Sequence, residues 1–130
     1  MIYLTAEQAL FIHSRLISET GGTHGLRELG LLQSALARPR TTFDGKELHP
    51  DLFSKAAALL DSLVNNHPCV DGNKRTGITC AGIFLRLNGW EMTATNDELE
   101  EFTLFVASSH PEIQAIKIWL KKHSHKHKGV

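Results

Sequence analysis

The sequence predicts an all-α protein, a compact bundle of about six helices around a buried central helix. Apolar residues recur at three- and four-residue steps along most of the chain, which is the period of an amphipathic helix. Capping residues precede several of these stretches, and glycine or proline follows them. One stretch, residues 73–88, is apolar on nearly all sides, as expected of a helix that its neighbours bury.

The first half of the chain contains three predicted helices. The first begins after Thr5, where a Thr-x-x-Gln capping box precedes the apolar stripe, and a Gly-Gly pair ends it. A short helix follows over about residues 28–37, with a proline just beyond it. Residues 40–50 are rich in turn-forming types and are expected to form a loop or short hairpin. A third amphipathic helix covers about residues 51–65.

The second half adds the central helix and two more. An Asn-Gly pair ends the central helix, and residues 90–95 are expected to be briefly extended. Thr95 and Glu98 form another capping box ahead of a fifth helix. Pro111 suits the first turn of a last helix. We therefore expect one domain over residues 1–122 and a disordered basic tail, rich in His and Lys, over residues 123–130.

Composition limits the classes of function. The chain has 130 residues, of which 42% are hydrophobic and 22% charged, so it is expected to be one globular domain. Lys and Arg together number 14, as do Asp and Glu, so direct nucleic-acid binding is not expected. No apolar run reaches about 18 residues, the two cysteines form no disulfide framework, and the N-terminus lacks a basic leader. These features favour a cytoplasmic protein with no membrane association.

One segment, His67-Pro68-Cys69-Val70-Asp71-Gly72-Asn73-Lys74-Arg75, carries the signs of chemistry. It precedes and opens the central helix, and a helix N-terminus offers free amides and a partial positive charge to an anion. Gly72 allows a ligand to approach the backbone closely. Lys74 and Arg75 oppose the helix dipole, so they favour a bound anion such as a triphosphate.

Two further side chains in this segment suit phosphate transfer to a hydroxyl. His67 can accept a proton at neutral pH. Asp71 is a lone carboxylate among hydrogen-bond donors and cations, and beside a phosphate it suits the binding of a hard cation such as Mg²⁺. From the residues alone, a helix-opening loop with a surface charge cluster explains the segment equally well.

The segment resembles the signature of the Fic/Doc (Fido) superfamily, and Asn73-Lys74-Arg75 is similar to the Doc branch, the death-on-curing toxins. The Fic branch has glycine at the place of Lys74 and an arginine at the place of Ile78. Residues 25–39 resemble a second stretch common in Doc-type proteins. The resemblance extends over about residues 3–120 and implies the helical Fido fold with a small flap. In that family the flap helps to hold the target, and residues 41–48 are the candidate here.

The resemblance implies a role for each matching residue. His67 would be the base that activates the target hydroxyl, and Asp71 would help to hold Mg²⁺ and the reacting phosphate. The phosphates of ATP would be held by Gly72, Asn73, Lys74 and Arg75. Cys69 stands where the family usually has a phenylalanine that anchors the loop in the core. Cys69 is either a small buried hydrophobe or, beside His67, a nucleophile.

The activity that the resemblance implies is protein-kinase-like. A Doc-like toxin would transfer the γ-phosphoryl group of ATP to a Thr or Ser hydroxyl of a protein such as elongation factor Tu, arresting translation, and a cognate antitoxin would neutralise it. Two alternatives remain. A Fic-type AMP transferase is disfavoured by Lys74. A catalytically silent antitoxin-binding module is disfavoured by the intact motif and favoured only by Cys69.

Overall fold

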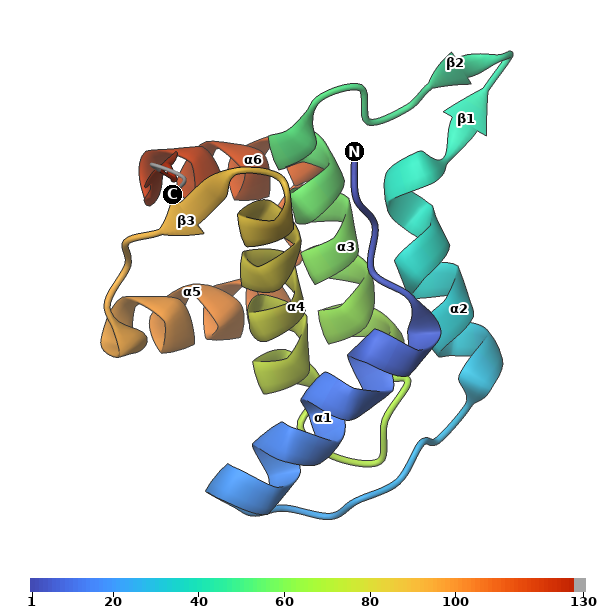
Figure 1. The fold of residues 1–130 in the computed structure, drawn as a ribbon, viewed down its shortest axis with the longest axis vertical. Coiled ribbons are helices and arrows are strands. Elements are labelled where there is room, and N and C mark those ends of the chain that lie inside the picture. Colours follow the sequence, from blue (N-terminus) through green and yellow to red (C-terminus); the bar gives the residue numbers. More distant parts are fainter. Residues whose placement is uncertain (128–130) are drawn as a thin grey trace.

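The computed structural model describes residues 1–127, and within them six α-helices form the bundle (Figure 1). Helices α3 and α4 lie side by side at the centre, with α1 and α2 on one flank and α5 and α6 on the other. The all-α prediction is confirmed, and α3 shares the buried centre with α4. The helices are α1 (Ala6–Thr20), α2 (Leu29–Ala37), α3 (Leu52–Asn66), α4 (Asn73–Leu87), α5 (Asn96–Ser109) and α6 (Ile113–Lys122).

Capping boxes fix where three of the helices begin. Thr5 and Thr95 each accept a hydrogen bond from the amide three residues on, and the side chain at that position bonds back to the cap. Both boxes are those predicted from the sequence. Asp51 caps α3 in the same way, with Ser54 as its reciprocal partner.

A short hairpin precedes α3. Strands β1 (Thr42–Phe43) and β2 (Lys46–Glu47) pair across Asp44 and Gly45, whose φ angles of 56° and 76° are those of a tight hairpin turn. The buried Lys55 of α3 ties the base of the hairpin to the core, donating to Pro39 O (3.0 Å) and to Glu47 Oε1 (2.8 Å). The hairpin therefore stands at the N-terminal end of α3 (Figure 1).

The C-terminal segment differs from the disordered tail expected over residues 123–130. Strand β4 (Ser124–Lys126) pairs antiparallel with β3 (Trp90–Met92). The His123 ring stacks on Trp119 with centroids 3.9 Å apart, so His123 acts as a packing group. Residues 123–127 therefore belong to the folded unit, while residues 128–130 lie outside the described residues.

Close packing of α3 against α4 depends on Gly77. A Cβ atom there would lie 2.9 Å from Val64 Cγ2 and 3.4 Å from Leu60 Cδ1, both in the buried core. Gly82 is different, because a Cβ there would meet only Met92 Sδ, at 3.4 Å. Of the two glycines in α4, only Gly77 is required by packing.

Gly77→Ala is expected to lower the free energy of unfolding by about 1–3 kcal/mol, since Val64 is β-branched and cannot move aside without strain. Gly82→Ala is the matched control, and helix propensity should raise stability there by up to about 1 kcal/mol. Urea denaturation of both variants checks this. Equal effects of the two substitutions would contradict the close-contact argument.

Candidate functional site

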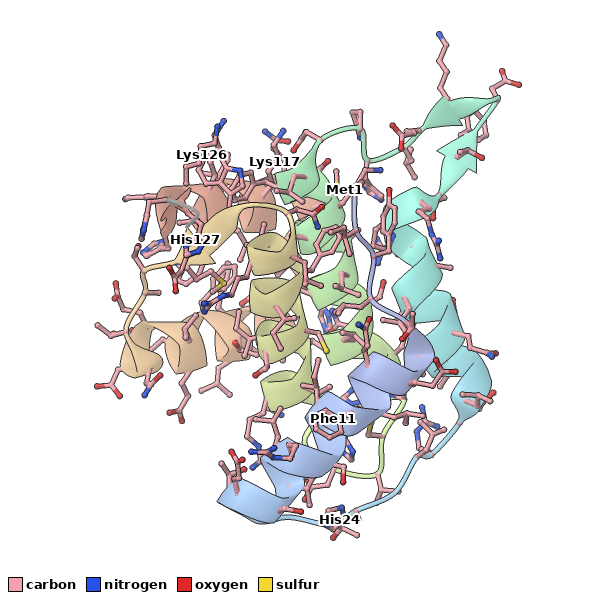
Figure 2. The ribbon with its side chains drawn as sticks, viewed as in Figure 1. Met1, Phe11, His24, Lys117, Lys126 and His127 are labelled. Carbon is pink, nitrogen blue, oxygen red and sulfur yellow. The ribbon has the colours of Figure 1, made fainter. Side chains whose placement is uncertain are left out.

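The motif forms the loop from the C-terminal end of α3 to the first turn of α4, at the bottom of Figure 1. His67 is the exposed C-cap of α3 and has a left-handed backbone (φ 50°, ψ 57°). Lys74 is also exposed, and Asp71 is half-buried. Lys117 and Lys126 lie at the opposite end of the molecule from His24, which follows α1 near this loop (Figure 2). Lys117 and Lys126 are therefore remote from the motif.

Asp71 is held by backbone groups from both sides. Its Oδ1 accepts the Gly72 amide (2.8 Å) and its Oδ2 accepts the Thr23 amide (3.0 Å). The His13 Nε2 atom lies 2.8 Å from the Asp71 main-chain oxygen. The hydrogen bonds from Thr23 and Gly72, with the nearby Arg75 charge, hold the pKa of Asp71 below its ordinary value. Asp71 is therefore an anion at neutral pH, and each oxygen keeps a free lone pair.

Arg75 is bound to the C-terminal end of α1. Its Nη1 donates to Thr20 Oγ1 and to Gly21 O, the latter at 3.1 Å. A cation at a helix C-terminus interacts favourably with the dipole of that helix. The C-terminal end of α1 therefore offsets the unfavourable interaction of the Arg75 charge with the α4 dipole, which was the only interaction expected from the sequence. Lys74 makes no ion pair within residues 1–127.

Within residues 1–127 no side chain caps the N-terminus of α4, in contrast to α1, α3 and α5. Gly72 occupies the N-cap in the left-handed region (φ 74°), and a Cβ there would lie 2.9 Å from Ile17 Cδ1. Only glycine fits this position without strain. The first-turn amides of α4 are therefore free for a ligand.

A cavity of about 640 Å³ opens at this helix end. Its volume is in the range of small-molecule sites. One wall carries the motif residues, and the facing wall is partly apolar. His67 does not line it. The lining residues are Leu16, Thr20, Asp71, Gly72, Asn73, Lys74, Arg75, Ile78, Thr79, Asn96, Leu99, Glu100, Thr103 and Leu104.

The Asn73 side chain clamps the loop. Its Oδ1 accepts the Cys69 amide and its Nδ2 donates to the Cys69 carbonyl, both at 2.9 Å. The side-chain amide is thus engaged by the protein, and the backbone amide of Asn73 is the group left for a phosphate. Cys69 is only 3% exposed, and burial raises the pKa of its thiol. A protonated, buried thiol is a poor nucleophile, so of the two alternatives for Cys69 the structure favours the buried hydrophobe.

A divalent cation would find one protein carboxylate in the motif. No cluster of three or more His, Cys, Asp or Glu side chains suited to a metal occurs within residues 1–127. Mg²⁺ commonly binds through one or two carboxylates together with substrate phosphates. The ionised Asp71, beside free helix amides, fits a Mg²⁺ ion held mainly by a nucleotide.

The segment that borders the loop was singled out only in part, because the second Doc-like stretch begins at residue 25 and residues 20–24 carried no signal of their own. Residues 20–28 run beside it, with Thr20 and Thr23 bound to the motif, and Leu26 forms an isolated β-bridge with Cys69. The hairpin of residues 42–47 lies at the other end of α3, about 22 Å away along a helix of 15 residues. The hairpin therefore does not border this loop.

Comparison with known proteins identifies the family. Residues 3–85 match the Fic/DOC family. This chain belongs to that family. The family that the motif predicted is thus confirmed.

Two characterised proteins are similar to this chain. A protein named Toxin Doc, from Mycolicibacterium smegmatis, is 49% identical over 77 residues, which are 59% of each chain. The Protein kinase doc of Escherichia phage P1 is 27% identical over 122 residues, 94% of this chain and 95% of that one. The present chain therefore spans about three-fifths of the first relative and nearly all of the second. No helix within residues 1–127 is long and apolar enough to span a membrane.

Replacing Asn73 by alanine should destabilise the protein. Asn73→Ala leaves the buried amide and carbonyl of Cys69 without partners, which should cost about 2 kcal/mol of unfolding free energy. Asn65→Ala is the control, because it removes a single bond to the side chain of Asp61 and should cost less than about 1 kcal/mol. Urea titration measures the unfolding free energy of both variants. A loss in Asn73→Ala no larger than that in Asn65→Ala would show that the Asn73 side chain does not hold the loop.

Asp71→Asn should change how stability depends on pH. Because the folded-state pKa of Asp71 lies below its ordinary value of 3.8, its contribution is fully present above that value and is lost as the pH falls through the folded pKa. Wild type should therefore lose more stability than Asp71→Asn between pH 6 and about pH 2. Urea midpoints of the two proteins across this range provide the measurement. Parallel curves would show that the Thr23 and Gly72 amides do not stabilise the carboxylate.

Proposed function

We propose that the protein is a Doc-like toxin that transfers the γ-phosphoryl group of ATP to a Thr or Ser hydroxyl of a protein target. The observation that carries the proposal is the uncapped N-terminus of α4, which opens into the cavity beside Lys74 and Arg75. Membership of the Fic/DOC family and the names of both relatives, Toxin Doc and Protein kinase doc, support it.

The nucleotide phosphates would bind at the start of α4. The amides of the first turn, from Asn73 onward, donate hydrogen bonds there, and Gly72 leaves room for the phosphates to approach. Lys74 supplies a mobile charge and Arg75 a charge fixed by α1. Asp71 would hold Mg²⁺, which when bound neutralises phosphate charge.

His67 would act as the base. Its side chain forms no hydrogen bond within the described residues and is exposed, so a hydroxyl can reach it. The hydroxyl oxygen attacks the γ-phosphorus, His67 accepts the hydroxyl proton, and the bond from the γ-phosphorus to the bridging oxygen breaks to release ADP. Positioning and electrostatic stabilisation supply most of the catalysis in such transfers.

Lys74 and Ile78 favour phosphoryl transfer over AMP transfer. Both line the cavity, and the lysine side chain takes up space that a glycine would leave for the phosphate tail of the nucleotide. The apolar Ile78 offers no contact to a phosphate. These features support a nucleotide bound with its γ-phosphorus toward the hydroxyl.

The partners proposed are a target protein such as elongation factor Tu and a cognate antitoxin. The name of the Mycolicibacterium relative supports the toxin class. The apolar part of the cavity wall, formed by Leu16, Leu99 and Leu104, is a surface on which an antitoxin segment could fold. The ordered loop, clamped by Asn73, speaks against a catalytically silent module.

The test follows label from ATP. Purified protein is incubated with a bacterial extract and with ATP labelled at either the γ or the α position. A separate reaction replaces the extract with purified elongation factor Tu. We expect γ label on protein and no α label. Mass spectrometry of the modified protein then distinguishes a phosphate from an AMP adduct. Transfer of α label alone would replace the kinase assignment with AMP transfer.

His67→Ala should abolish the transfer, by at least about a hundredfold, as loss of a general base does. The matched control is His110→Ala. His110 is also an exposed, left-handed C-cap histidine (φ 46°), at the end of α5 and outside the cavity. The His110→Ala variant should keep wild-type activity. A fully active His67→Ala would exclude this residue as the base.

A further inference from the structure

The end of α3 is stabilised from outside the helix. His67 and His110 are both left-handed C-caps, a conformation that is strained for residues other than glycine. The His110 amide bonds back to its own helix, at Val106 O (3.2 Å). The His67 amide forms no such bond within the described residues. Other groups must therefore hold His67 in place.

The side chain of Arg27 holds the end of α3 in place. Its Nε donates to His67 O (2.7 Å) and its Nη2 donates to Asn66 O (2.9 Å), so one planar group satisfies two terminal carbonyls of α3. The next carbonyl, Pro68 O, accepts the amides of Arg27 (2.8 Å) and Glu28 (3.1 Å). Three successive carbonyls are thus bound by two neighbouring residues.

The loop therefore has two separate anchors. The half that carries His67 is held by residues 25–28, since Val70 N also donates to Gly25 O (3.0 Å). The half that carries Asp71 and Arg75 is held by His13, Thr20 and Thr23. Loss of one anchor should leave the other intact.

We propose that Arg27 is a positioning residue for His67: its guanidinium fixes the backbone of the base and so orients the imidazole toward the target hydroxyl. The inference rests on the proposed function, in which His67 is the base. Arg27 acts through main-chain carbonyls and does not touch the substrate. Lysine, with a single point charge, reproduces only part of this two-pronged contact.

The kinetic test compares Arg27→Ala and Arg27→Lys with wild type in the ATP transfer assay. Because a misplacement of about 1 Å can cost about a hundredfold in rate, we expect kcat of Arg27→Ala to fall by about 10- to 100-fold. The KM for ATP should change by less than about twofold, because the phosphate half keeps its anchors. The kcat of Arg27→Lys should lie between those of wild type and Arg27→Ala. Added methylguanidinium should partly restore the kcat of Arg27→Ala.

Arg15→Ala is the matched control, since Arg15 contacts Glu19 and the ring of Phe11 on the exposed face of its own helix, and its loss should leave kcat unchanged. If Arg27→Ala keeps its kcat within about twofold, the inference is overturned while the proposed function stands. A rise in KM that accounts for the whole loss would also overturn it, because Arg27 would then serve nucleotide binding.

A second readout is independent of activity. In NMR spectra, the HN–Hα coupling and the Cα and Cβ shifts of His67 report its left-handed backbone. Arg27→Ala should shift these signals toward right-handed or averaged values, whereas His110, which has its own cap, should keep them. If the wild type transfers nothing, the proposed function fails, and an unchanged His67 spectrum in Arg27→Ala would then overturn the inference as well. Should Arg27→Ala fail to fold, Arg27→Lys provides the same measurement.

Discussion

The close approach of α3 and α4 at Gly77 determines where the ends of these two helices lie. Because the methyl of an alanine there would meet Val64 and Leu60, the two axes can come together only with a hydrogen at that position. The loop of residues 67–72 has to span from one of these helices to the other, and its geometry follows from their separation. The site is therefore set first by apolar packing in the core and only then by the polar groups of the loop.

The charges of the site are arranged on helix ends. The C-terminal end of α1 binds Arg75, and the N-terminal end of α4 remains without a cap. Bringing a negative helix end and a positive one together allows the protein to keep the Arg75 guanidinium at the start of α4 without a direct ion pair to an acidic side chain within the described residues. Asp71 fits the same scheme, because backbone amides rather than basic side chains are the main cause of its lowered pKa.

Local signals were sufficient to predict the helices and the motif. The capping boxes at Thr5 and Thr95 involve residues three apart, and the apolar stripes repeat within one or two turns. Long-range contacts were not predictable in this way. The sequence of β4 has no apolar alternation, and it is ordered by pairing with a strand more than thirty residues earlier. Arg27 likewise reaches carbonyls about forty residues away, and nothing in its own neighbourhood signals that contact.

Cys69 shows why the loop does not need an aromatic anchor. Its side chain is small and fully packed, yet the residue is held by five hydrogen bonds in its vicinity: the two from Asn73, the two that Pro68 O accepts from Arg27 and Glu28, and the one from Val70 N to Gly25 O. Hydrogen bonds to buried main-chain groups restrict a loop more directly than a side chain in a pocket, because they fix the backbone itself. The loop can therefore tolerate a smaller residue at position 69 as long as Asn73 and residues 25–28 remain in place. Rigidity that comes from the backbone also leaves the exposed imidazole of His67 free of structural duties, as the role proposed for it as a base requires.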